Sequence, residues 1–415
     1  MLEELFDLGA LYVSDFLKPD EEPAMEPQSL KLVRDDKTCE VRLQRTVDPT
    51  KMYGRYWYRS GTNATMTAEL ASIVESIRKL KPVPTDDATR VWLDIACNDG
   101  TLLKFVPGSE YLTVGIDPCD DTFADQAREH ADTIVQDFFT QKAWQDNTAW
   151  IADDAKADVV TCIAMFYDLD DPAPFLNDVH AVMADDGVFV LQMSYSPLML
   201  AQTAFDNICH EHVYYYTLYT LAARLEAAGF RVMDCQLNDV NGGSFRVYAV
   251  KQTADVTTFG TQPQRDVANF RVISVMCLED ALNANDAKPW LDFWETVKLL
   301  KEETVNFIKA AKADGKTVWG YGASTKGNTL LQLFGLDHTL IDGIAERSPY
   351  KFGLKTVGTN IPIYSEEEMR AAKPDYLLVL PWHFIGEFVQ REAAFLEAGG
   401  KFIVPCPVFS VISSA

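Results

Sequence analysis

The chain has 415 residues, of which 47% are hydrophobic and 24% charged, and its formal net charge is −24. This length is enough for several domains with packed cores, and the composition argues against extended disorder. No basic block interrupts the acidic residues, which argues against a nucleic acid as partner. An anionic small molecule would need a local pocket of basic side chains and backbone N–H groups.

The N-terminal residues and the cysteines indicate the cellular compartment of the protein. Acidic residues stand where a secretory signal would be positively charged, and no apolar run approaches the roughly 18 residues of a membrane span. The eight cysteines include no Cys-x-x-Cys pair, which is typical of reduced thiols. We therefore expect a cytoplasmic protein with a small-molecule substrate and with neither a membrane nor a nucleic acid as partner.

Residues 1–65 contain short apolar runs broken by Pro and Asp, and they predict a small, loop-rich N-terminal domain. Apolar residues then recur at helical spacing over 66–80, and Pro82 and Pro84 end this predicted helix. Over 91–194, apolar strands alternate with helical patterns. This alternation is typical of an open parallel sheet.

The larger sheet is predicted to end in an antiparallel hairpin. After a long irregular insert at 195–217, a helix over 218–228 leads to two strands joined by a Gly-Gly-Ser turn. A further helix over 296–313 precedes a second alternation of strands and helices, which predicts a smaller parallel sheet. The predicted fold class is α/β, with an N-terminal domain, a Rossmann-like domain, a helical connection and a C-terminal Rossmann-like domain over residues 1–65, 66–254, 255–300 and 301–415.

A candidate cofactor turn follows the first strand of the larger sheet. Asp94 closes that strand, and turn-forming residues bring the backbone close to a ligand before a helix predicted to begin at Thr101. The next strand ends in Asp117, about twenty residues on, where a carboxylate can accept both hydroxyls of a ribose. The candidate cofactor-binding residues are Asp94, Ala96, Asn98, Asp99, Gly100 and Asp117, with Asp137 and Phe138 as an acceptor and an apolar face for an adenine.

The composition of this turn distinguishes two cofactors. A pyrophosphate cofactor favours Gly-x-Gly-x-x-Gly, whereas this turn carries Asn and Asp, which suit a sulfonium amino acid with an ammonium group. The sequence therefore favours S-adenosylmethionine over NAD. The alternative is that Asp94 and Asp117 only end strands and cap turns.

The insert contains a stretch from Phe205 to Tyr216 in which two of the six histidines flank a carboxylate, as His210-Glu211-His212. One imidazole would remove a proton as general base, while Glu211 orients a ring and stabilises its charged form. Such a base suits a carbon acid beside a carbonyl, because an electrophilic methyl group needs an enolate as its partner. The alternatives are a metal site, although zinc needs a third ligand at suitable spacing, and a loop whose rings only fill space.

Motifs along nearly the full chain resemble those of the S-adenosylmethionine-dependent nucleotide-sugar C-methyltransferases that make branched deoxysugars. The resemblance implies a class I methyltransferase Rossmann-like domain, a C-terminal Rossmann-like domain and an N-terminal zinc-binding domain. It implies methylation at C3 of a nucleotide-linked 4-keto-6-deoxy sugar. The motifs, in the order of the family, are YWYRSGTN (56–63), DIACNDGTLL (94–103), GIDP (115–118), FDNICHEHVYYYTL (205–218), NGGSFRVYA (241–249), GYGASTKGNTLL (320–331) and KPDYLLVLPWHF (373–384).

The resemblance also implies roles for single residues. The last histidine of the family's Tyr-His-Glu-His motif is the base and falls on His212, and the glutamate falls on Glu211. An aromatic residue of a Tyr-x-Tyr segment reaches the site, which makes Tyr56 and Tyr58 candidates. The candidate catalytic residues are His212, Glu211, His210, Cys209, Asp168 and Tyr58, and the candidate substrate-binding residues are Tyr56, Asn207, Tyr216, Ser324 and Lys326.

The chain departs from the family pattern at three places. Cys209 replaces the motif's tyrosine, and Asp168 replaces a histidine before an Asp-Asp-Pro turn, which leaves the substrate and the position of methylation open. The family's paired Cys-x-x-Cys zinc ligands are absent, with Cys39 alone in the matching region. We therefore predict no structural zinc and an N-terminal domain held by aromatic packing.

A glycine-rich turn in the C-terminal half supplies rival hypotheses. Gly320-Tyr-Gly322-Ala-Ser324-Thr-Lys326 follows a strand and opens a helix, and Glu346 ends the next strand, as in a dinucleotide or phosphate cradle. The resemblance implies that this turn lies near the anionic end of the substrate. The alternatives are an NAD-dependent oxidoreductase, a catalytically idle protein that binds a sugar nucleotide, and an O- or N-methyltransferase. The sequence leaves the nucleotide, the sugar and the oligomeric state open.

Overall fold

The computed structural model describes residues 1–52, 57–83 and 88–414. The chain divides into two compact units, which we name the central unit and the C-terminal unit. The central unit consists of Asp48–Ser196 and Tyr214–Asn285. The C-terminal unit combines both ends of the chain with part of the insert, as Met1–Val47, Pro197–Val213 and Asp286–Ala415.

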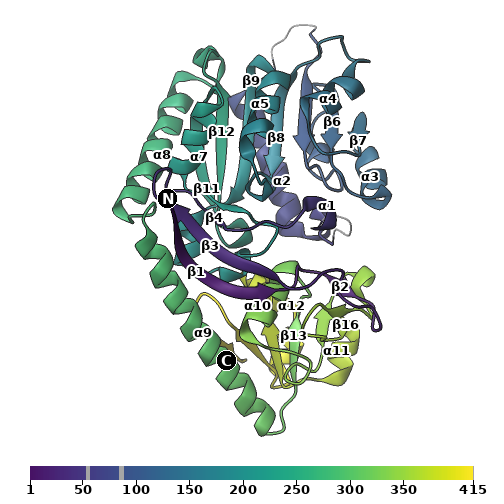
Figure 1. Cartoon of the computed structure of the whole chain (residues 1–415). Helices are drawn as coiled ribbons and strands as arrows, with labels where there is room; N and C mark the ends of the chain where they lie inside the picture. The colour runs from purple at the N-terminus through teal and green to yellow at the C-terminus, as the bar shows by residue number, and fades with distance from the viewer. Residues whose placement is uncertain (53–56, 84–87, 415) are drawn as a thin grey trace. The chain divides into compact units, whose positions relative to one another are not determined.

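The central unit is built on a seven-stranded sheet in the order β11-β12-β9-β8-β5-β6-β7 (Figure 1). Strands β5 to β9 pair in parallel, and β12 pairs antiparallel with both β9 and β11. The predicted open parallel sheet and its closing hairpin are therefore confirmed. The strands are β5 (Val91–Ile95), β6 (Leu112–Ile116), β7 (Thr133–Val135), β8 (Ala157–Ile163), β9 (Met183–Ser194), β11 (Phe230–Asn238) and β12 (Ser244–Lys251).

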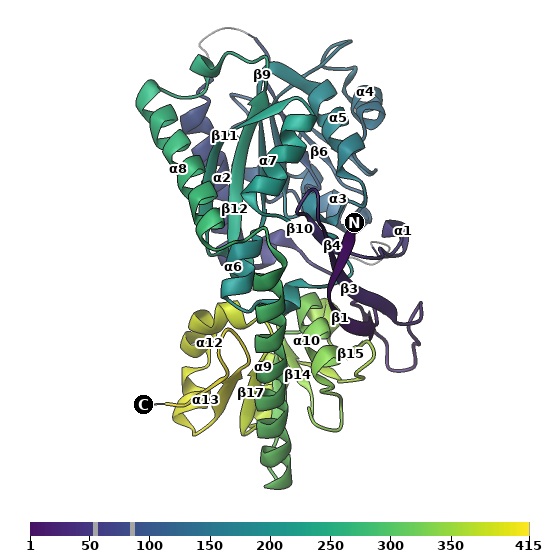
Figure 2. The same cartoon turned by 60° about the vertical axis from the view of Figure 1, so that its left-hand side comes forward.

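Helices cover both faces of this sheet. Successive residues of a strand point to opposite faces, and two neighbours in β9 pack toward different helices. Val190 of β9 lies in one core cluster with Ile73 of α2 (Ala64–Leu80). Its neighbour Phe189 contacts Phe230, whose ring contacts His180 of α5 (Pro172–Val182). Figure 2 shows α7 and α8, which both contact β11. The remaining helices of this unit are α1 (Pro49–Met52), α3 (Asp121–Arg128), α4 (Gln141–Thr148), α7 (Leu218–Ala227) and α8 (Gln262–Ala281).

The helix predicted over 66–80 is confirmed as α2. The side chain of Asn63 accepts hydrogen bonds from the backbone N–H groups of Thr65 and Met66, which caps the first turn. The buried side chains recur at spacings of three and four residues, so one face of the helix supplies the core contact. They belong to Met66, Leu70, Ile73, Val74, Ile77 and Leu80.

The C-terminal unit contains a six-stranded sheet in the order β16-β14-β13-β17-β18-β19, parallel except for the edge strand β19. The predicted second parallel sheet is therefore confirmed. Its strands are β13 (Val318–Tyr321), β14 (Ile344–Glu346), β16 (Ile363–Ser365), β17 (Tyr376–Val379), β18 (Lys401–Val404) and β19 (Ser410–Ile412). Its helices are α9 (Ala287–Ala313), α10 (Thr325–Phe334), α11 (Glu366–Ala372), α12 (Ile385–Arg391) and α13 (Ala393–Glu397).

The short elements α6 (Ser196–Ala201) and β10 (Tyr214–Tyr215) stand near the two ends of the insert. Within the described part of the chain, no helix is both long enough and apolar enough to cross a membrane.

The first 47 residues form strands rather than the loop-rich domain that the sequence predicted. β1 (Leu2–Leu11) and β4 (Val41–Leu43) pair antiparallel with β3 (Gln28–Asp35), and β2 (Phe16–Leu17) pairs with β15 (Lys355–Thr356).

Aromatic packing holds these strands within the C-terminal unit. The ring of Phe6 stacks on Trp294 of α9, with centroids 4.9 Å apart, and Asn328 of α10 donates a hydrogen bond to the hydroxyl of Ser14. A segment of this length buries only a modest apolar core by itself. The N-terminal segment therefore joins the C-terminal unit instead of forming a domain of its own.

The two units differ from the predicted domain boundaries at other points. Residues 48–65 lie in the central unit, the segment 197–213 of the insert lies in the C-terminal unit, and the predicted connection over 255–300 is divided. Helix α8 belongs to the central unit because Arg271 pairs with Asp234 of β11, whereas α9 contacts β1 and β13. Contacts between residues distant in the sequence decide these boundaries.

Candidate active site

The carboxyl edge of the central sheet carries a sharp turn after β5. The backbone φ angle is positive at Ala96 and Asn98, at 58° and 53°, and again at Gly100, at 76°. A Cβ atom at position 100 would lie 2.7 Å from the Cα of Ala127 in α3. Glycine is therefore required where the turn meets this helix.

The α-helix predicted to begin at Thr101 is not formed. The chain makes only a single 3-10 turn at Leu103–Phe105, and Val106 is already extended, with φ −74° and ψ 124°. Pro107 explains this, because a proline disfavours helical geometry in the residue before it. The prediction was wrong at this point.

Asp117 follows β6 beside the turn, and two backbone donors hold its carboxylate. The N–H of Asn98 donates to Oδ2 and the N–H of Cys119 donates to Oδ1, both at 2.8 Å. A carboxylate offers about four lone-pair sites, so Asp117 keeps acceptor capacity for two hydroxyl groups. Its place at the carboxyl end of parallel strands is where α/β sheets bind ligands.

Asp94 is 3% exposed, and its carboxylate accepts a hydrogen bond of 2.6 Å from Thr161 Oγ1 of β8. Burial raises the pKa of Asp94 to about 7, and the charge of Asp117 contributes to the rise. A bound ammonium group would favour the charged forms of both acids. The two carboxylate acceptors of this edge therefore fit S-adenosylmethionine, which carries such a group.

The side chains of Asn98 and Asp99 hold the segment that precedes α2. The backbone N–H groups of Ser60 and Gly61 donate to Asn98 Oδ1 at 3.0 Å and to Asp99 Oδ2 at 2.8 Å. Asn98 Nδ2 in turn donates to the carbonyl of Tyr58 at 3.0 Å. This places Tyr58, which is 41% exposed, beside the cofactor turn.

Tyr56, the other candidate of this segment, lies outside the described residues.

The remaining candidates of the central unit follow the strands β7, β8 and β10. Asp137 and Phe138 are exposed, and the Phe138 ring, at 44% exposure, offers an open apolar face. Asp168 is partly buried in a 3-10 turn after β8. Tyr216 is 1% exposed and packs against Phe166, with ring centroids 5.5 Å apart. Its ring therefore belongs to the core of the unit.

In the C-terminal unit, the His212 ring is fixed in one tautomer. Nδ1 lies 2.7 Å from the carbonyl oxygen of Asn207. Because a carbonyl only accepts hydrogen bonds, Nδ1 carries the hydrogen and Nε2 keeps its lone pair. Burial and the charge of Lys326 lower the pKa of His212 to about 3, so the ring is neutral at pH 7.

The side chain of Asn207 joins this ring to Lys326. Its Oδ1 accepts a hydrogen bond from the Lys326 ammonium group, in the first turn of α10. Ser324 caps the same helix, since its hydroxyl accepts from the N–H of Gly327 at 2.9 Å. Of the predicted substrate-binding residues, Asn207, Lys326 and Ser324 are thus brought to one helix terminus.

The other residues of the insert motif have different partners. Cys209 is buried, and Nε2 of His210 donates to the carbonyl of Gln28 at 3.1 Å, which anchors the motif to β3. Burial lowers the pKa of His210, while the charge of Glu211 acts in the opposite direction. Within the described residues, Glu211 Oε2 is buried without a hydrogen-bond partner.

Two residues that the sequence analysis did not select lie at the same helix terminus. Asp206 is 1% exposed, its Oδ2 accepts a hydrogen bond of 3.2 Å from Trp382 Nε1, and burial raises its pKa. His383 follows that tryptophan, and burial together with the charge of Lys326 lowers its pKa to about 3. Both stand in motifs of the family, and His383 is one of only six histidines, which was a signal in the sequence.

Glu346 secures the glycine-rich turn of this unit. Its Oε2 accepts from the N–H of Ala323 at 2.8 Å, and its Oε1 accepts from the N–H groups of Arg347 and Ser348 at 2.7 and 2.8 Å. A Cβ atom at Gly322 would lie 2.7 Å from the ring of Pro381. The carboxylate therefore supports the turn itself, which accounts for its position without an NAD ribose.

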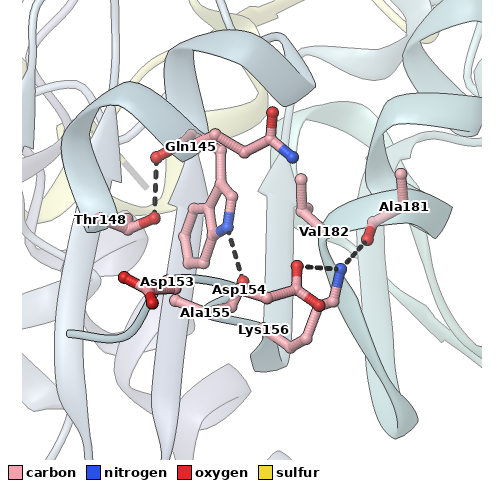
Figure 3. Close-up of a pocket in the computed structure, with 9 residues that line it drawn as sticks. Gln145, Thr148, Asp153, Asp154, Ala155, Lys156, Ala181 and Val182 are labelled. Carbon is pink, nitrogen blue, oxygen red and sulfur yellow. Dashed lines mark hydrogen bonds and ion pairs between the residues drawn. The ribbon is translucent and has the colours of Figure 1, made fainter.

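A surface pocket of the central unit lies at the other end of the sheet (Figure 3). Four of its lining residues, 153–156, directly precede β8 and so lie at the amino end of that strand. Trp144 Nε1 donates to the carbonyl of Ala155 at 2.9 Å and closes one wall. Because the two acids of the candidate cofactor turn lie at carboxyl ends, this pocket is separate from the candidate cofactor site.

Within ranges 1–52, 57–83 and 88–414, no group of three or more His, Cys, Asp or Glu side chains is placed to hold a metal ion. Cys39 accepts a hydrogen bond from Arg34 Nη2 at 3.4 Å.

Two family models match successive parts of the chain. A family model described as "Methyltransferase domain" matches residues 63–234, and one described as "C-methyltransferase C-terminal domain" matches residues 239–407. The C-methyltransferase NovU of Streptomyces niveus is 30% identical over 379 residues, which cover 90% of this chain and 85% of that protein. This chain belongs to the C-methyltransferase family. It is an S-adenosylmethionine-dependent methyltransferase, which confirms the predicted enzyme class, cofactor and Rossmann-like fold.

Solved methyltransferases resemble parts of this C-methyltransferase. Magnesium protoporphyrin IX methyltransferase of Synechocystis PCC 6803 is 16% identical, with a TM-score of 0.34, over 48% of this chain and 91% of that one. The plantazolicin methyltransferase BpumL is 9% identical, with a TM-score of 0.37, over 46% of this chain and 87% of that one. Both likenesses cover less than half of the chain.

Proposed function

We propose that this C-methyltransferase methylates C3 of a nucleotide-linked 4-keto-6-deoxy sugar, with His212 as the base. The observation that supports this most is the hydrogen bond between Nδ1 of His212 and the Asn207 carbonyl, at 2.7 Å. It leaves the lone pair of a neutral ring on Nε2, which suits acceptance of a proton. We place this reaction in the cytoplasm, on a small molecule.

The first step is removal of a proton beside the ketone. Nε2 of His212 takes the proton, the electron pair of the C–H bond forms the enolate double bond, and the carbonyl oxygen becomes negative. The ammonium group of Lys326, bound to Asn207, supplies positive charge for an anionic ligand. S-adenosylmethionine supplies an electrophilic methyl group.

The residues of the turn after β5 would bind the cofactor. Asp117 has lone pairs for the ribose hydroxyls, Asp94 has a carboxylate for the ammonium group, and Phe138 has an exposed ring for the adenine, beside Asp137. The predicted residues Ala96, Asn98, Asp99 and Gly100 shape the turn that brings the backbone close to the ligand.

Polar groups of the insert motif and of the glycine-rich turn would bind the sugar nucleotide. The buried Oε2 of Glu211, which accepts no hydrogen bond from the described residues, suits a sugar hydroxyl. The N-terminus of α10, with Ser324 and Lys326, suits an anionic group. Tyr58 is the exposed aromatic residue beside the cofactor turn.

The positions that depart from the family would decide which sugar is used. Cys209 cannot offer the hydrogen bond of a phenol, and Asp168 carries a carboxylate in place of an imidazole. We propose that these two changes adapt the enzyme to a different sugar or stereochemistry rather than to another reaction.

The test is incubation with a panel of 4-keto-6-deoxy sugar nucleotides and S-adenosylmethionine in D2O. Mass spectrometry and NMR follow the gain of a methyl group and the uptake of deuterium at the carbon beside the ketone. Methyl gain on carbon, with deuterium uptake by the same substrate, is the expected result. His212→Ala, with unchanged binding of S-adenosylhomocysteine, should slow both methyl gain and deuterium uptake by about 10²–10⁴.

Other outcomes would change the assignment. Methylation on an oxygen or nitrogen without deuterium uptake would contradict the enolate and favour an O- or N-methyltransferase. Binding of the cofactor without methylation or exchange on any member of the panel would mean that the acceptor is a different molecule.

A further inference from the structure

His383 lies close enough to Lys326 for the charge of the ammonium group to act on its ring. Trp382, its neighbour in the chain, is 5% exposed and donates through Nε1 to Asp206 at 3.2 Å. Asp206 in turn precedes Asn207, whose side chain binds Lys326. The loop after β17 and the insert motif are therefore joined by a buried hydrogen bond, and His383 comes to the same end of α10 as His212.

The ring of His383 contacts the aromatic rings of its two neighbours in the chain. Its centroid lies 4.2 Å from that of Phe384 and 5.8 Å from that of Trp382. Neither ring nitrogen forms a hydrogen bond with any residue that the structure describes. The side chain is only partly buried, so a ligand can reach these nitrogens. An imidazole held in place with both nitrogens available is suited to bind a ligand.

The charge state of the ring limits what it can bind. Burial and the ammonium group of Lys326 disfavour protonation of His383, as they do for His212. A neutral imidazole has one N–H donor and one acceptor. Such a donor stabilises a developing oxyanion without giving up its proton, because its own acidity is far lower than that of an imidazolium.

We infer that His383 donates its ring N–H to the ketone oxygen of the substrate and stabilises the oxyanion that forms when His212 removes the neighbouring proton. This inference rests on the proposed function. As the C–H bond breaks, its proton goes to His212 Nε2 and its electron pair enters the enolate, whose oxygen accepts the hydrogen bond from His383. Methyl transfer to the enolate carbon would break the methyl–sulfur bond of S-adenosylmethionine, leave S-adenosylhomocysteine and restore the ketone. His212 then releases its proton to solvent.

The experiment separates enolate formation from methyl transfer. The full chain is incubated in D2O with the substrate of the proposed function and with S-adenosylhomocysteine, which has no methyl group to give. The rate of deuterium uptake beside the ketone is then measured for the wild type, His383→Leu, His383→Gln and the control His338→Leu, which changes an exposed histidine of the same unit. Thermal unfolding of each variant checks its fold.

We expect His383→Leu to slow both deuterium uptake and kcat by about 10²–10³, the usual loss when one oxyanion donor is removed. His383→Gln, which keeps an N–H donor, should recover part of this loss. His338→Leu should match the wild type, and KM should change much less than kcat.

Three results would overturn the inference or its basis. Wild-type rates of uptake in a folded His383→Leu would remove His383 from the reaction while leaving the proposed function intact. A rise in KM with unchanged uptake would make His383 a ligand of the anionic end of the substrate. No uptake by the wild type itself would overturn the proposed function first, and the role of His383 with it.

Discussion

The carbonyl oxygen of Asn207 lies 2.7 Å from Nδ1 of His212. A backbone group thus orients the ring, while the side chain of the same asparagine binds Lys326. Orientation of the proposed base therefore depends on the path of the main chain through the insert. Replacement of His212 should therefore lower the reaction rate more than it lowers the stability of the fold.

Loss of the proposed base should remove turnover and spare the cofactor. We expect His212→Ala to lower kcat by about 10²–10⁴, the range of general acid–base catalysis. Glu211→Gln should also lower kcat, since it removes the negative charge between the two histidines of the motif. Stopped assays give kcat, and calorimetry gives the affinity for S-adenosylhomocysteine. A parallel loss of affinity and turnover in both variants would point to a structural role for the motif.

Lys326 should control the protonation of His212. Its positive charge is one of two causes that lower the pKa of His212 to about 3, and burial is the larger. Lys326→Met should therefore raise this pKa while leaving it below the ordinary value of about 6.5. NMR titration of the ring, with the exposed His338 as internal reference, measures the change. An unaltered titration of His212 would show that Lys326 exerts no field on the ring.

Asp117 should be needed for the cofactor. Asp117→Asn removes a charged acceptor and disturbs the turn that the carboxylate holds through the N–H of Asn98. We expect affinity for S-adenosylmethionine to fall about 10- to 100-fold, as for loss of a charged hydrogen bond. Asp153→Asn, an exposed acid at the opposite end of the sheet, is the matched control. Equal affinities of the two variants would exclude Asp117 from the binding site.

Cofactor binding should strengthen as the pH rises through about 7. Burial holds the pKa of Asp94 near that value, so the carboxyl group is protonated below it. The ammonium group of the cofactor favours the ionised acid, and binding should therefore release a proton. Affinity should rise by up to about tenfold per pH unit below 7 and level off above it. Asp94→Asn should bind more weakly, with little dependence on pH in calorimetric titrations.

The raised pKa of Asp94 also makes the stability of the fold depend on pH. Because the pKa of Asp94 is higher in the folded protein than in the unfolded chain, its contribution is greatest below about pH 4 and is lost as the pH rises through about 7. The Asp94→Asn variant should lose this part of the pH dependence of unfolding.

The N-terminal strands should be held by Phe6. Its ring is 4% exposed and stacks on Trp294 at 4.9 Å. Phe6→Ala should lower the free energy of unfolding by about 3–5 kcal/mol, the range for truncation of a buried phenylalanine. Phe270→Ala, at a ring that is 70% exposed, should have almost no effect. Urea unfolding followed by fluorescence compares the two, and equal midpoints would contradict this packing.

Much of the fold could be predicted, and a candidate cofactor site selected, because the signals for both are local. Alternating strands and helices predict parallel sheets from one stretch of chain at a time, and Asp94 and Asp117 are recognised by their places at the ends of strands. The failure at Thr101 has a local cause as well, since Pro107 stops the helix that the apolar pattern favours.

The sequence by itself determined the α/β class, the order of the two sheets, the cofactor turn and the insert motif that carries His212. Only the tertiary structure decided that the N-terminal strands join the C-terminal unit, and that His212 is oriented by the Asn207 carbonyl. It also brought Lys326 to Asn207, 119 positions away in the chain, and His383 to the same helix terminus. Hydrogen bonds and charges between distant residues depend on packing that no local pattern encodes, and for this reason the environment of the proposed base became visible only in the folded chain.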